Sequence, residues 1–383
     1  MSELSYLEKL LDGVEVEWRN LGDTSLFEIA NNGRKPVKAS LRIAGETPYY
    51  GANNIQDYVD GYTHDGEYVL IAEDGSASLE NYSIQYATGK FWANNHVHVV
   101  RGKERVHSRF LYHYLCIVNF LPFLTGGGRA KLTKGQLIEI PVPIPCPGNP
   151  EKSLAIQSEI VRILDKFTEL IAELTAELSM RKKQYNYYRD QLLSFKEGEV
   201  KWKTLGEITE INTGQKPSEI LDKAATFDYI NAGTSRSGYT TMSNCDGDTV
   251  TTPSRGQGGI GFVGYQKTPF WLGPLCYKIK SLNNEILINK FLFYTLQSRN
   301  RILLSLKKEG GVPAVNKIDL AKLIIPLPSL DEQKRIVSLL DKFDTLTNSI
   351  TEGLPREIEL RQKQYEYYRD LLFSFPKPET VSN

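Results

Sequence analysis

The residues of this 383-residue sequence that are best suited to chemistry gather in a glycine-rich stretch, SRGQGGIGFVGYQKT (254–268). Glycines let a backbone approach a ligand closely. Arginine and glutamine hydrogen-bond bidentately to guanine and adenine in the major groove of DNA, and lysines suit contacts with phosphates. The stretch therefore predicts recognition of a nucleic acid. The residues predicted to bind DNA in this half of the chain are Ser254, Arg255, Gln257, Lys267 and, in the turn NTGQKP, Lys216.

The first half of the chain offers two comparable stretches, the glycine-rich GGGRAKLTK (126–134) and the turn NNGRKP (31–36). Their basic side chains suit phosphates and base edges in the same way. A single basic residue in a loop is more often simply solvated, so the prediction depends on the combination of glycines and cations. The predicted DNA-binding residues here are Arg34, Lys35, Arg129, Lys131 and Lys134.

Sequence motifs of common enzymes are absent. The chain has no GxxxxGK[ST] phosphate loop, no GxGxxG at the start of a βαβ unit and no HExxH zinc motif. It also lacks the Asn/Asp-Pro-Pro-Tyr/Phe tetrapeptide with which amino-methyltransferases hold a flipped base. The nearest match, TPYY (47–50), has neither the acidic or amide residue nor the second proline. The sequence therefore favours recognition without catalysis.

Two small groups of residues leave other kinds of site open. His96 and His98 in NNHVHVV are spaced to place two metal ligands on one face of a strand, but a strand with alternating polar side chains explains them equally well. Glu67, Glu73 and Asp74 form a candidate nuclease carboxylate cluster, but carboxylates beside glycine turns are common. We predict no metal site.

The elements that must position these loops are revealed by an internal repeat. KQYNYYRDQLLSF (183–195) returns as KQYEYYRDLLFSF (363–375), and each copy ends a long amphipathic pattern. In the first copy apolar residues recur every three or four positions, which predicts a continuous helix over 153–195 with a coiled-coil seam. Gly353 and Pro355 interrupt the second copy, so a kinked or two-piece helix is expected there. Matching seams in one chain most simply pack on each other in antiparallel fashion.

The repeated stretch carries more tyrosines than one seam can hold. Some of them must face outward, and we expect those to contact a partner protein. The candidate partner-binding residues are Tyr185, Tyr187, Tyr188, Tyr365, Tyr367 and Tyr368.

Each long helix follows a globular segment of the same plan. Short β-type runs broken by Gly, Asn and Asp lead to a stretch of helical character, 109–121 in the first half and 290–306 in the second. Each segment ends in a proline-rich run, 132–145 or 315–328, which predicts an edge strand because proline cannot donate to a central ladder. Leucines on one helical face over 4–11 predict a short N-terminal helix.

Composition restricts the class of protein. Apolar content of 40% and charged content of 24% are those of a soluble globular protein. No apolar run is long enough for a membrane span, and the N-terminus lacks the features of a secretory signal. Four scattered cysteines without a CxxC pair indicate reduced thiols and a cytoplasmic protein. The formal net charge of zero argues against DNA binding through bulk charge alone, so any DNA binding is local or shared with a partner.

The order of variable segment, long helix ending in KQYNYYRDQLLSF, variable segment and long helix ending in KQYEYYRDLLFSF resembles the specificity subunit of type I restriction-modification systems. The LDKF phrases, the IAEL–TAEL tetrads and the SRGQGG-type loop are similar to features of that family. The start MSELSYLEKLLDGVEVEW resembles its IC subgroup. The resemblance covers the whole chain.

The repeat and the resemblance together imply an α/β (α+β) fold. Two globular target recognition domains would be separated by two long antiparallel coiled-coil helices, in a pseudo-twofold arrangement. The implied division is a first recognition domain with the short N-terminal helix over 1–150, a spacer helix over 151–197, a second recognition domain over 198–328, and a second spacer helix with the C-terminal tail over 329–383.

The resemblance also implies a function. The chain would be the non-catalytic subunit that binds a bipartite, asymmetric site on double-stranded DNA, one half read by each domain. Two methyltransferase subunits with S-adenosylmethionine, and restriction subunits that translocate DNA with ATP and Mg, would join it, so the chain would need no cofactor of its own. Two alternatives stay open: a coiled-coil assembly scaffold with two modules for non-DNA ligands, and a self-contained nuclease or methyltransferase.

Overall fold

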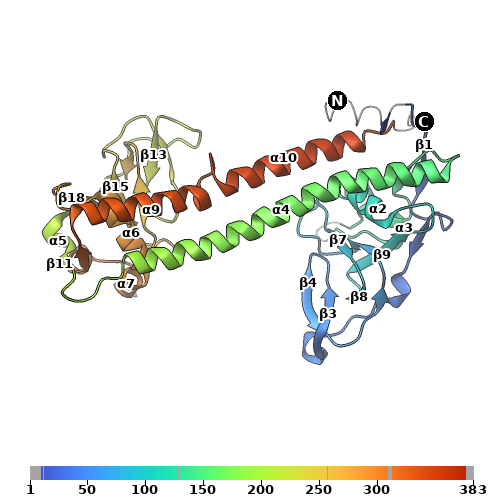
Figure 1. The fold of residues 1–383 in the computed structure, drawn as a ribbon, viewed down its shortest axis with the longest axis horizontal. Helices are drawn as coiled ribbons and strands as arrows, with labels where there is room; N and C mark the ends of the chain where they lie inside the picture. The colour runs from blue at the N-terminus through green and yellow to red at the C-terminus, as the bar shows by residue number, and fades with distance from the viewer. Residues whose placement is uncertain (1–9, 12, 127–129, 257, 309–312, 377–383) are drawn as a thin grey trace. The chain divides into compact units, whose positions relative to one another are not determined.

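The chain, seen in a computed structural model, divides into two compact units (Figure 1). Unit 1 comprises Met1–Glu173 and Glu359–Asn383, and unit 2 comprises Leu174–Ile358. The structure describes residues 10–11, 13–126, 130–256, 258–308 and 313–376. The predicted N-terminal helix over 4–11 therefore lies largely outside the described residues.

Unit 1 holds two four-stranded sheets, in the orders β2-β9-β6-β7 and β4-β3-β8-β5, and a two-stranded ribbon, β1-β10. Most of its strand pairs are antiparallel, and β3 with β8 is parallel. Its elements are β1 (Val16–Asn20), β2 (Phe27–Ile29), η1 (Asn31–Gly33), η2 (Ala39–Leu41), β3 (Ala44–Tyr50), β4 (Ile55–Val59), β5 (His64–Asp65), β6 (Tyr68–Ala72), β7 (Ile84–Ala87), β8 (Lys90–Ala93), β9 (Val97–Gly102), α2 (Ser108–Leu115), η3 (Leu121–Phe123), α3 (Lys134–Leu137) and β10 (Pro141–Pro145).

Unit 2 repeats this plan. Its four-stranded sheet has the order β12-β18-β15-β16, beside a three-stranded sheet, β14-β13-β17, and a ribbon, β11-β19. The parallel pair recurs as β13 with β17. Its elements are β11 (Lys201–Thr204), α5 (Leu205–Ile208), β12 (Thr209–Thr213), β13 (Phe227–Ile230), β14 (Gly238–Thr240), β15 (Thr249–Pro253), β16 (Gly264–Gln266), β17 (Trp271–Leu272), β18 (Cys276–Ser281), α6 (Asn289–Ser298), α7 (Asn300–Ser305), α8 (Lys317–Ala321) and β19 (Ile324–Leu327).

The central strands explain where the cores sit. Every residue of β6 and of β15 is buried, so these strands have packed side chains on both faces. The proline-rich strands behave in the opposite way: β10 pairs with β1 alone and β19 with β11 alone among the described strands. The predicted edge strands are confirmed.

The long helices confirm the pattern of the repeat. α4 (Pro150–Leu192) is continuous over 43 residues, and the second copy is broken into α9 (Leu330–Asn348) and α10 (Leu354–Leu372). At the break, Gly353 has a φ of +82°, and a Cβ there would lie 2.4 Å from the Thr345 carbonyl oxygen. The backbone conformation and the lack of space both require glycine.

The helices also contribute to the core of each unit. In unit 1 the first part of α4 lies beside α10 with the opposite chain direction (Figure 1), and Phe167 stacks on Tyr368. In unit 2, Tyr188 of α4 stacks on Phe343 of α9. The first part of α4, up to Glu173, therefore belongs to unit 1 and the rest to unit 2. The sequence suggested a separate helical segment over 151–197.

Two predicted helices are shorter than expected. The helical stretch over 109–121 ends at Leu115 in α2, and Pro122 lies in the separate short helix η3 (Leu121–Phe123). The stretch over 290–306 is divided into α6 and α7 at Arg299, which has a φ of −102° and a ψ of 22°.

Candidate nucleic-acid interface

In each unit a loop follows the central strand, β6 or β15. The loop of unit 2 contains the predicted DNA-binding residues Ser254 and Arg255, and the loop of unit 1 contains the residues at the equivalent positions. β6 is followed by Glu73, and β15 by Ser254. The Leu132 amide donates to the Glu73 carbonyl at 2.8 Å, and the Val315 amide donates to the Ser254 carbonyl at 2.9 Å. Both loops are thus tied in the same way to the segment that leads into the short helix α3 or α8.

One residue further along, the match between the units continues. Asp74 forms an isolated antiparallel bridge with Lys131, and Arg255 forms one with Ala314. Asp74 is therefore the structural counterpart of Arg255. The glycine-rich stretch 126–134 is not the counterpart of 254–268; it is the neighbouring loop, so each unit brings two loops together at this site.

A buried polar side chain holds the two loops in each unit. His98 on β9 and Tyr277 on β18 occupy the same register position in their sheets. His98 Nε2 hydrogen-bonds the Leu132 carbonyl at 2.7 Å, and the Tyr277 hydroxyl donates to the Val315 carbonyl at 3.0 Å. Two chemically different residues therefore perform the same anchoring role.

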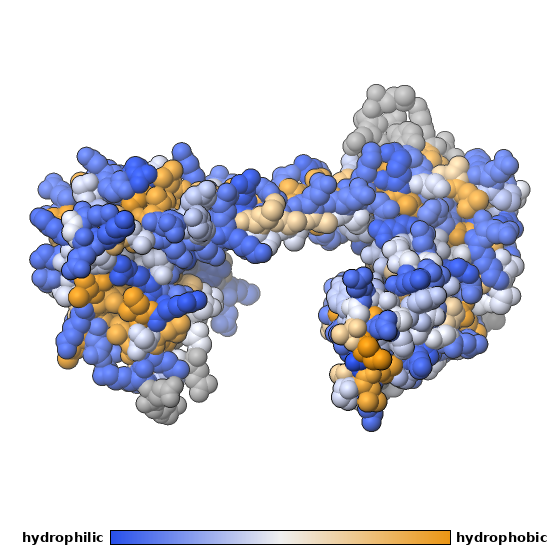
Figure 2. Space-filling model, turned by 60° about the horizontal axis from the view of Figure 1, so that its bottom comes forward, coloured by the Kyte–Doolittle hydropathy of each residue, from blue (hydrophilic) through white to orange (hydrophobic). Residues whose placement is uncertain are grey.

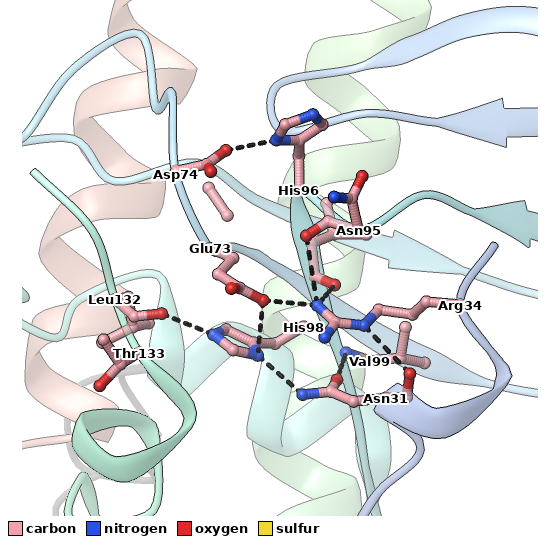
Figure 3. A network of polar contacts seen from close by, with 12 residues as sticks. Asn31, Arg34, Glu73, Asp74, Asn95, His96, His98, Val99, Leu132 and Thr133 are labelled. Carbon is pink, nitrogen blue, oxygen red and sulfur yellow. Dashed lines mark hydrogen bonds and ion pairs between the residues drawn. The ribbon is translucent and has the colours of Figure 1, made fainter. Parts of the chain in front are cut away.

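In unit 1 a polar network surrounds this anchor (Figure 3). The Glu73 carboxylate lies 2.6 Å from Arg34 Nη1 and 2.9 Å from Lys131 Nζ. Burial alone would raise the pKa of the Glu73 carboxyl, but the hydrogen bonds from Arg34 and Lys131 outweigh it and hold that pKa below its usual value. Arg34 also donates to the carbonyls of Asn31 and Val97.

These contacts involve two of the cations that were predicted to bind DNA. The side chain of Arg34 is 18% exposed and is occupied by one carboxylate and three carbonyls, those of Asn31, Asn95 and Val97, so it has structural partners and its DNA contact stays a prediction. Lys131 remains at the surface, but its charge is offset by Glu73. The sequence predicted that Arg34 and Lys131 bind DNA, but it did not indicate that both pair with Glu73.

The histidine pair also has structural partners. His98 is fully buried, and burial lowers the pKa of its imidazole. The neutral ring donates from Nε2 to Leu132, while Nδ1 accepts from Asn31 Nδ2 at 2.9 Å. His96 is half-exposed and hydrogen-bonds Asp74 at 2.5 Å through Nδ1. The two rings face different partners (Figure 3), and the described part of the chain contains no group of three or more metal-ligating side chains arranged around one point.

The carboxylate cluster considered from sequence does not form. Glu67 precedes β6 and accepts from the Tyr86 hydroxyl at 2.8 Å, whereas Glu73 follows β6. Six residues of extended chain separate them by roughly 20 Å at ~3.3 Å per residue.

The loops of unit 1 enclose a pocket of about 730 Å³. It lies between the loop after β3, the loop after β6, the turn before β9 and the segment before α3. The lining residues are Ala52, Asn53, Gln56, Asp74, Gly75, Ser76, Leu79, His96, Ala130 and Lys131. Amide, carboxylate, imidazole and ammonium groups together suit hydrogen bonding to base edges.

Unit 2 has a pocket of about 350 Å³ at a related position, between the loop after β13 and the β15–β16 hairpin. It is lined by Asp228, Ile230, Asn231, Ala232, Gly233, Thr234, Ser235, Arg236, Thr251, Pro253, Phe262, Gly264, Tyr265, Gln266 and Cys276. Beside it, Ser254 is half-buried and Arg255 is exposed. Within the described residues Arg255 has no ion pair or side-chain hydrogen bond, so its guanidinium is available to a ligand.

The predicted lysines are exposed but do not form one cluster. Lys216 follows Gln215, whose carbonyl accepts from the Trp271 indole at 2.7 Å. Lys267 follows β16, at the end of the hairpin opposite to Arg255. The five residues of β15, which span about 16 Å at ~3.3 Å per residue, lie between the two.

Lys35 and Lys134 are exposed in unit 1. The Lys35 ammonium lies 5.9 Å from the centre of the Trp92 ring, and Lys134 begins α3. The predictions for Arg129 and Gln257 fall outside the described residues. The DNA contacts proposed for the exposed cations stay predictions.

The six tyrosines of the repeat divide by position. Tyr185 and Tyr365 are buried in the cores of their units, and the Tyr185 hydroxyl donates to Gln297 at 2.9 Å. Burial leaves these two no surface for a partner, so their predicted partner contact is replaced by a packing role.

The other four tyrosines reach the surface to different degrees. Tyr187 and Tyr367 are 61% and 53% exposed at equivalent positions of α4 and α10. Tyr188 is partly exposed and Tyr368 half-buried, and each stacks on a phenylalanine. The helical period of ~100° per residue explains this division. Residues three apart lie on the same packed face, and the tyrosine between them points elsewhere.

Sequence reasoning missed the pocket residues Asn53, Gln56 and, as a site component, His96 in unit 1, and Asn231 and Arg236 in unit 2. The only local signal for the first pair was the run of amides in GANNIQ (51–56). The relation of that run to the loop after β6 arises from the sheet and is absent from local sequence.

Figure 2 shows a mostly hydrophilic surface interrupted by small apolar patches. Exposed apolar side chains of unit 1 include Leu41 and Ile43, and those of unit 2 include Met242 and Ile318. No helix within the described ranges combines the length and apolar character needed to cross a bilayer.

Comparison with known proteins agrees with this arrangement. The model of the type I restriction modification DNA specificity domain matches the chain twice, over residues 14–180 and 197–360. A putative type I restriction enzyme specificity subunit of Haemophilus influenzae is 46% identical over 97% of this chain and 98% of its own length. The EcoR124I/EcoR124II specificity subunit of Escherichia coli is 42% identical over 100% of both chains.

Solved structures show the same fold. The S subunit of a type I restriction-modification system from M. genitalium has a TM-score of 0.68 and 19% identity, and the match covers 96% of this chain and 98% of that one. A chain from a structure describing complex assembly of the type I R-M system has a TM-score of 0.54 and 15% identity, over 94% and 97% of the two chains. With two specificity domains and close relatives matched along its full length, the chain belongs to the family of type I restriction enzyme specificity subunits.

Proposed function

We propose that each unit reads one half of a bipartite, asymmetric site on double-stranded DNA. One observation carries this proposal: the two units present the same pair of loops, held by the same backbone bonds, but with different side chains. Asp74 and Lys131 in unit 1 stand where Arg255 and Ala314 stand in unit 2. A constant scaffold with different polar groups at equivalent points suits the reading of two different base sequences.

As a specificity subunit the chain is non-catalytic, and catalysis lies with its partners. We propose two methyltransferase subunits that use S-adenosylmethionine to modify adenine, and restriction subunits that use ATP and Mg for translocation and cleavage. The net charge of zero supports shared DNA binding, because phosphate neutralisation dominates affinity for DNA. Tyr187 and Tyr367 are the proposed contacts with the methyltransferase subunits, since they are exposed at equivalent places.

Arg255→Ala in the chain assembled with its methyltransferase partners tests the proposal. A bidentate contact with guanine is worth about 1–3 kcal/mol of discrimination. We therefore expect binding to the cognate site, mapped from the modified adenines of a host genome, to weaken by about 5- to 150-fold, with a much smaller change on random duplex DNA.

Arg335→Ala is the matched control, because Arg335 is an exposed arginine on α9, paired with Glu332. It should leave the ratio of cognate to random binding unchanged. An equal loss on cognate and random DNA for Arg255→Ala would show that the residue contacts phosphate. A wild-type complex that retards no specific duplex would favour a scaffold with non-DNA modules.

A further inference from the structure

The pocket of unit 1 holds one side chain in an unusual setting. Gln56 lies in β4, where the register with β3 shifts: Tyr49 pairs with Asp57 and Tyr50 pairs with Ile55. Gln56 is thus the extra residue of a β-bulge. Bulges re-aim a side chain away from the regular alternation of the strand and are frequent beside functional sites.

The amide of Gln56 is held against the backbone of Gly51. A Cβ on Gly51 would lie 2.0 Å from Gln56 Nε2 and 2.3 Å from its Cδ, so the glutamine occupies the space that a side chain at position 51 would need. Gly51 is itself fixed, because its amide donates to Asn54 at 3.0 Å and its carbonyl accepts from Gln85 at 3.1 Å. The Gln56 amide therefore lies next to the backbone of Gly51 and remains exposed to a ligand.

Other polar groups that line this pocket are already engaged. Asn53 uses both ends of its amide, donating to the Gly75 carbonyl and accepting from the Ala77 amide, each at 2.8 Å. Ser76 donates to the Ser78 carbonyl and accepts from the Ser83 amide.

The charged groups of the lining are paired as well. Asp74 is bonded to His96, and Lys131 is bonded to Glu73. In contrast, the amide of Gln56 makes no hydrogen bond with any residue that the structure describes. Its donor and its acceptor are both free for a ligand.

We propose that Gln56 is a specificity-determining residue that reads an adenine in the half-site bound by unit 1. A glutamine amide offers a donor and an acceptor side by side, which match N7 and the N6 amino group of adenine; guanine presents two acceptors there. This assignment rests on the proposed function.

The test uses the chain assembled with its methyltransferase partners and a DNA library in which one base pair at a time is varied in both half-sites. Gln56→Ala removes the amide. Gly51→Ala leaves the amide in the protein but displaces it, at small cost, because Gly51 does not have a positive φ and the group it strikes is the end of a flexible side chain. Gln362→Ala is the control, an exposed glutamine on α10 bonded to Glu366.

Both pocket variants should reduce the preference for one A·T pair by about 5- to 150-fold in a single half-site. The other half-site and the control should keep their preferences. Gln56→Glu, whose carboxylate only accepts hydrogen bonds, should shift that position toward a C·G pair, because aspartate and glutamate accept from cytosine N4.

Unchanged preferences for Gln56→Ala and Gly51→Ala, in complexes whose wild type is selective, would overturn the assignment of Gln56 alone. A wild-type complex with no base preference in either half-site would instead overturn the proposed function. A loss of preference in both half-sites at once, with both variants folded, would place Gln56 in general affinity and would also overturn the assignment.

Discussion

The substitution Glu73→Ala tests the network that positions the loops of unit 1. It removes a carboxylate whose side chain is 15% exposed and which lies between Arg34 and Lys131. The guanidinium of Arg34 would keep its three carbonyl partners but lose its counter-charge. Breaking a buried ion pair by removing one partner costs ~3–5 kcal/mol. Because this pair is partly exposed, we expect about 3 kcal/mol, at the lower end.

Hydrogen exchange in the full chain measures this effect with an internal reference. A loss of about 3 kcal/mol in the local free energy of opening should speed exchange of the β6 and β9 amides by roughly 150-fold. The equivalent strands β15 and β18 in unit 2 should exchange at the wild-type rate. Lys131→Ala is the matched control, because an exposed ion pair contributes at most ~1 kcal/mol.

The pairing adds two further signatures. Arg34→Leu with Glu73→Leu removes both charges and should cost less than the sum of the single changes, since neither charge is left alone. The pKa of the Glu73 carboxyl is lowered by its partners, so its contribution is present above the unfolded pKa of ~4.5 and is lost as the pH falls through the lower folded value. An effect of Glu73→Ala no larger than that of Lys131→Ala, or strict additivity in the double variant, would refute this account of the network.

Two further predictions concern the helices and what packs on them. Burial lowers the pKa of His113 to about 4 despite its hydrogen bond to Asp165. The unfolded state therefore binds more protons than the folded state between pH 6.5 and 4. As the pH falls across that window, unit 1 should lose about 3 kcal/mol of its free energy of unfolding, from roughly 2.5 pKa units at 1.36 kcal/mol each. His113→Gln should flatten this slope in thermal melts at a series of pH values, and a slope equal to that of the wild type would count against His113 as its source. Tyr187→Ala and Tyr367→Ala should weaken assembly with the methyltransferase subunits, measured by calorimetric titration, with stability changed by less than ~0.5 kcal/mol. Tyr185→Ala and Tyr365→Ala should instead destabilise their units by roughly 3–5 kcal/mol; the reverse pattern would show that the packed tyrosines form the docking surface.

The parts of the fold that sequence predicted correctly have local causes. Proline removes a donor, so β10 and β19 had to lie at an edge. Gly353 and Pro355 break a helical pattern wherever that helix packs. The long period of the repeat likewise needs no tertiary information, and it predicted two units of one plan.

The site could be predicted only in outline. Whether a polar side chain is paired within the protein or available to a ligand depends on partners far away in sequence. Arg34 meets Glu73 39 residues later, and nothing around NNGRKP indicates this. The turns NNGRKP (31–36) and NTGQKP (212–217) match residue by residue in sequence, but their structural equivalence is shifted by one residue. The Trp92 indole donates to the Lys35 carbonyl, whereas the Trp271 indole donates to that of Gln215, which aligns with Arg34. In unit 1 this turn contains η1, whereas residues 212–214 of unit 2 form no helix.

The anchors suggest why the two units diverge so far while keeping one architecture. His98 and Tyr277 differ in size and in the chemistry of their donor, yet each places one donor on the carbonyl at the base of the second loop. What is common to the units is therefore a set of backbone positions, and a comparison of residue identities does not detect it. Stability depends on these buried anchors and on networks such as that of Glu73, whereas Gln56 and Arg255 contribute little to packing because they are exposed. Recognition residues can then change without loss of the scaffold, which is the physical condition for one fold to read two unrelated half-sites in one chain.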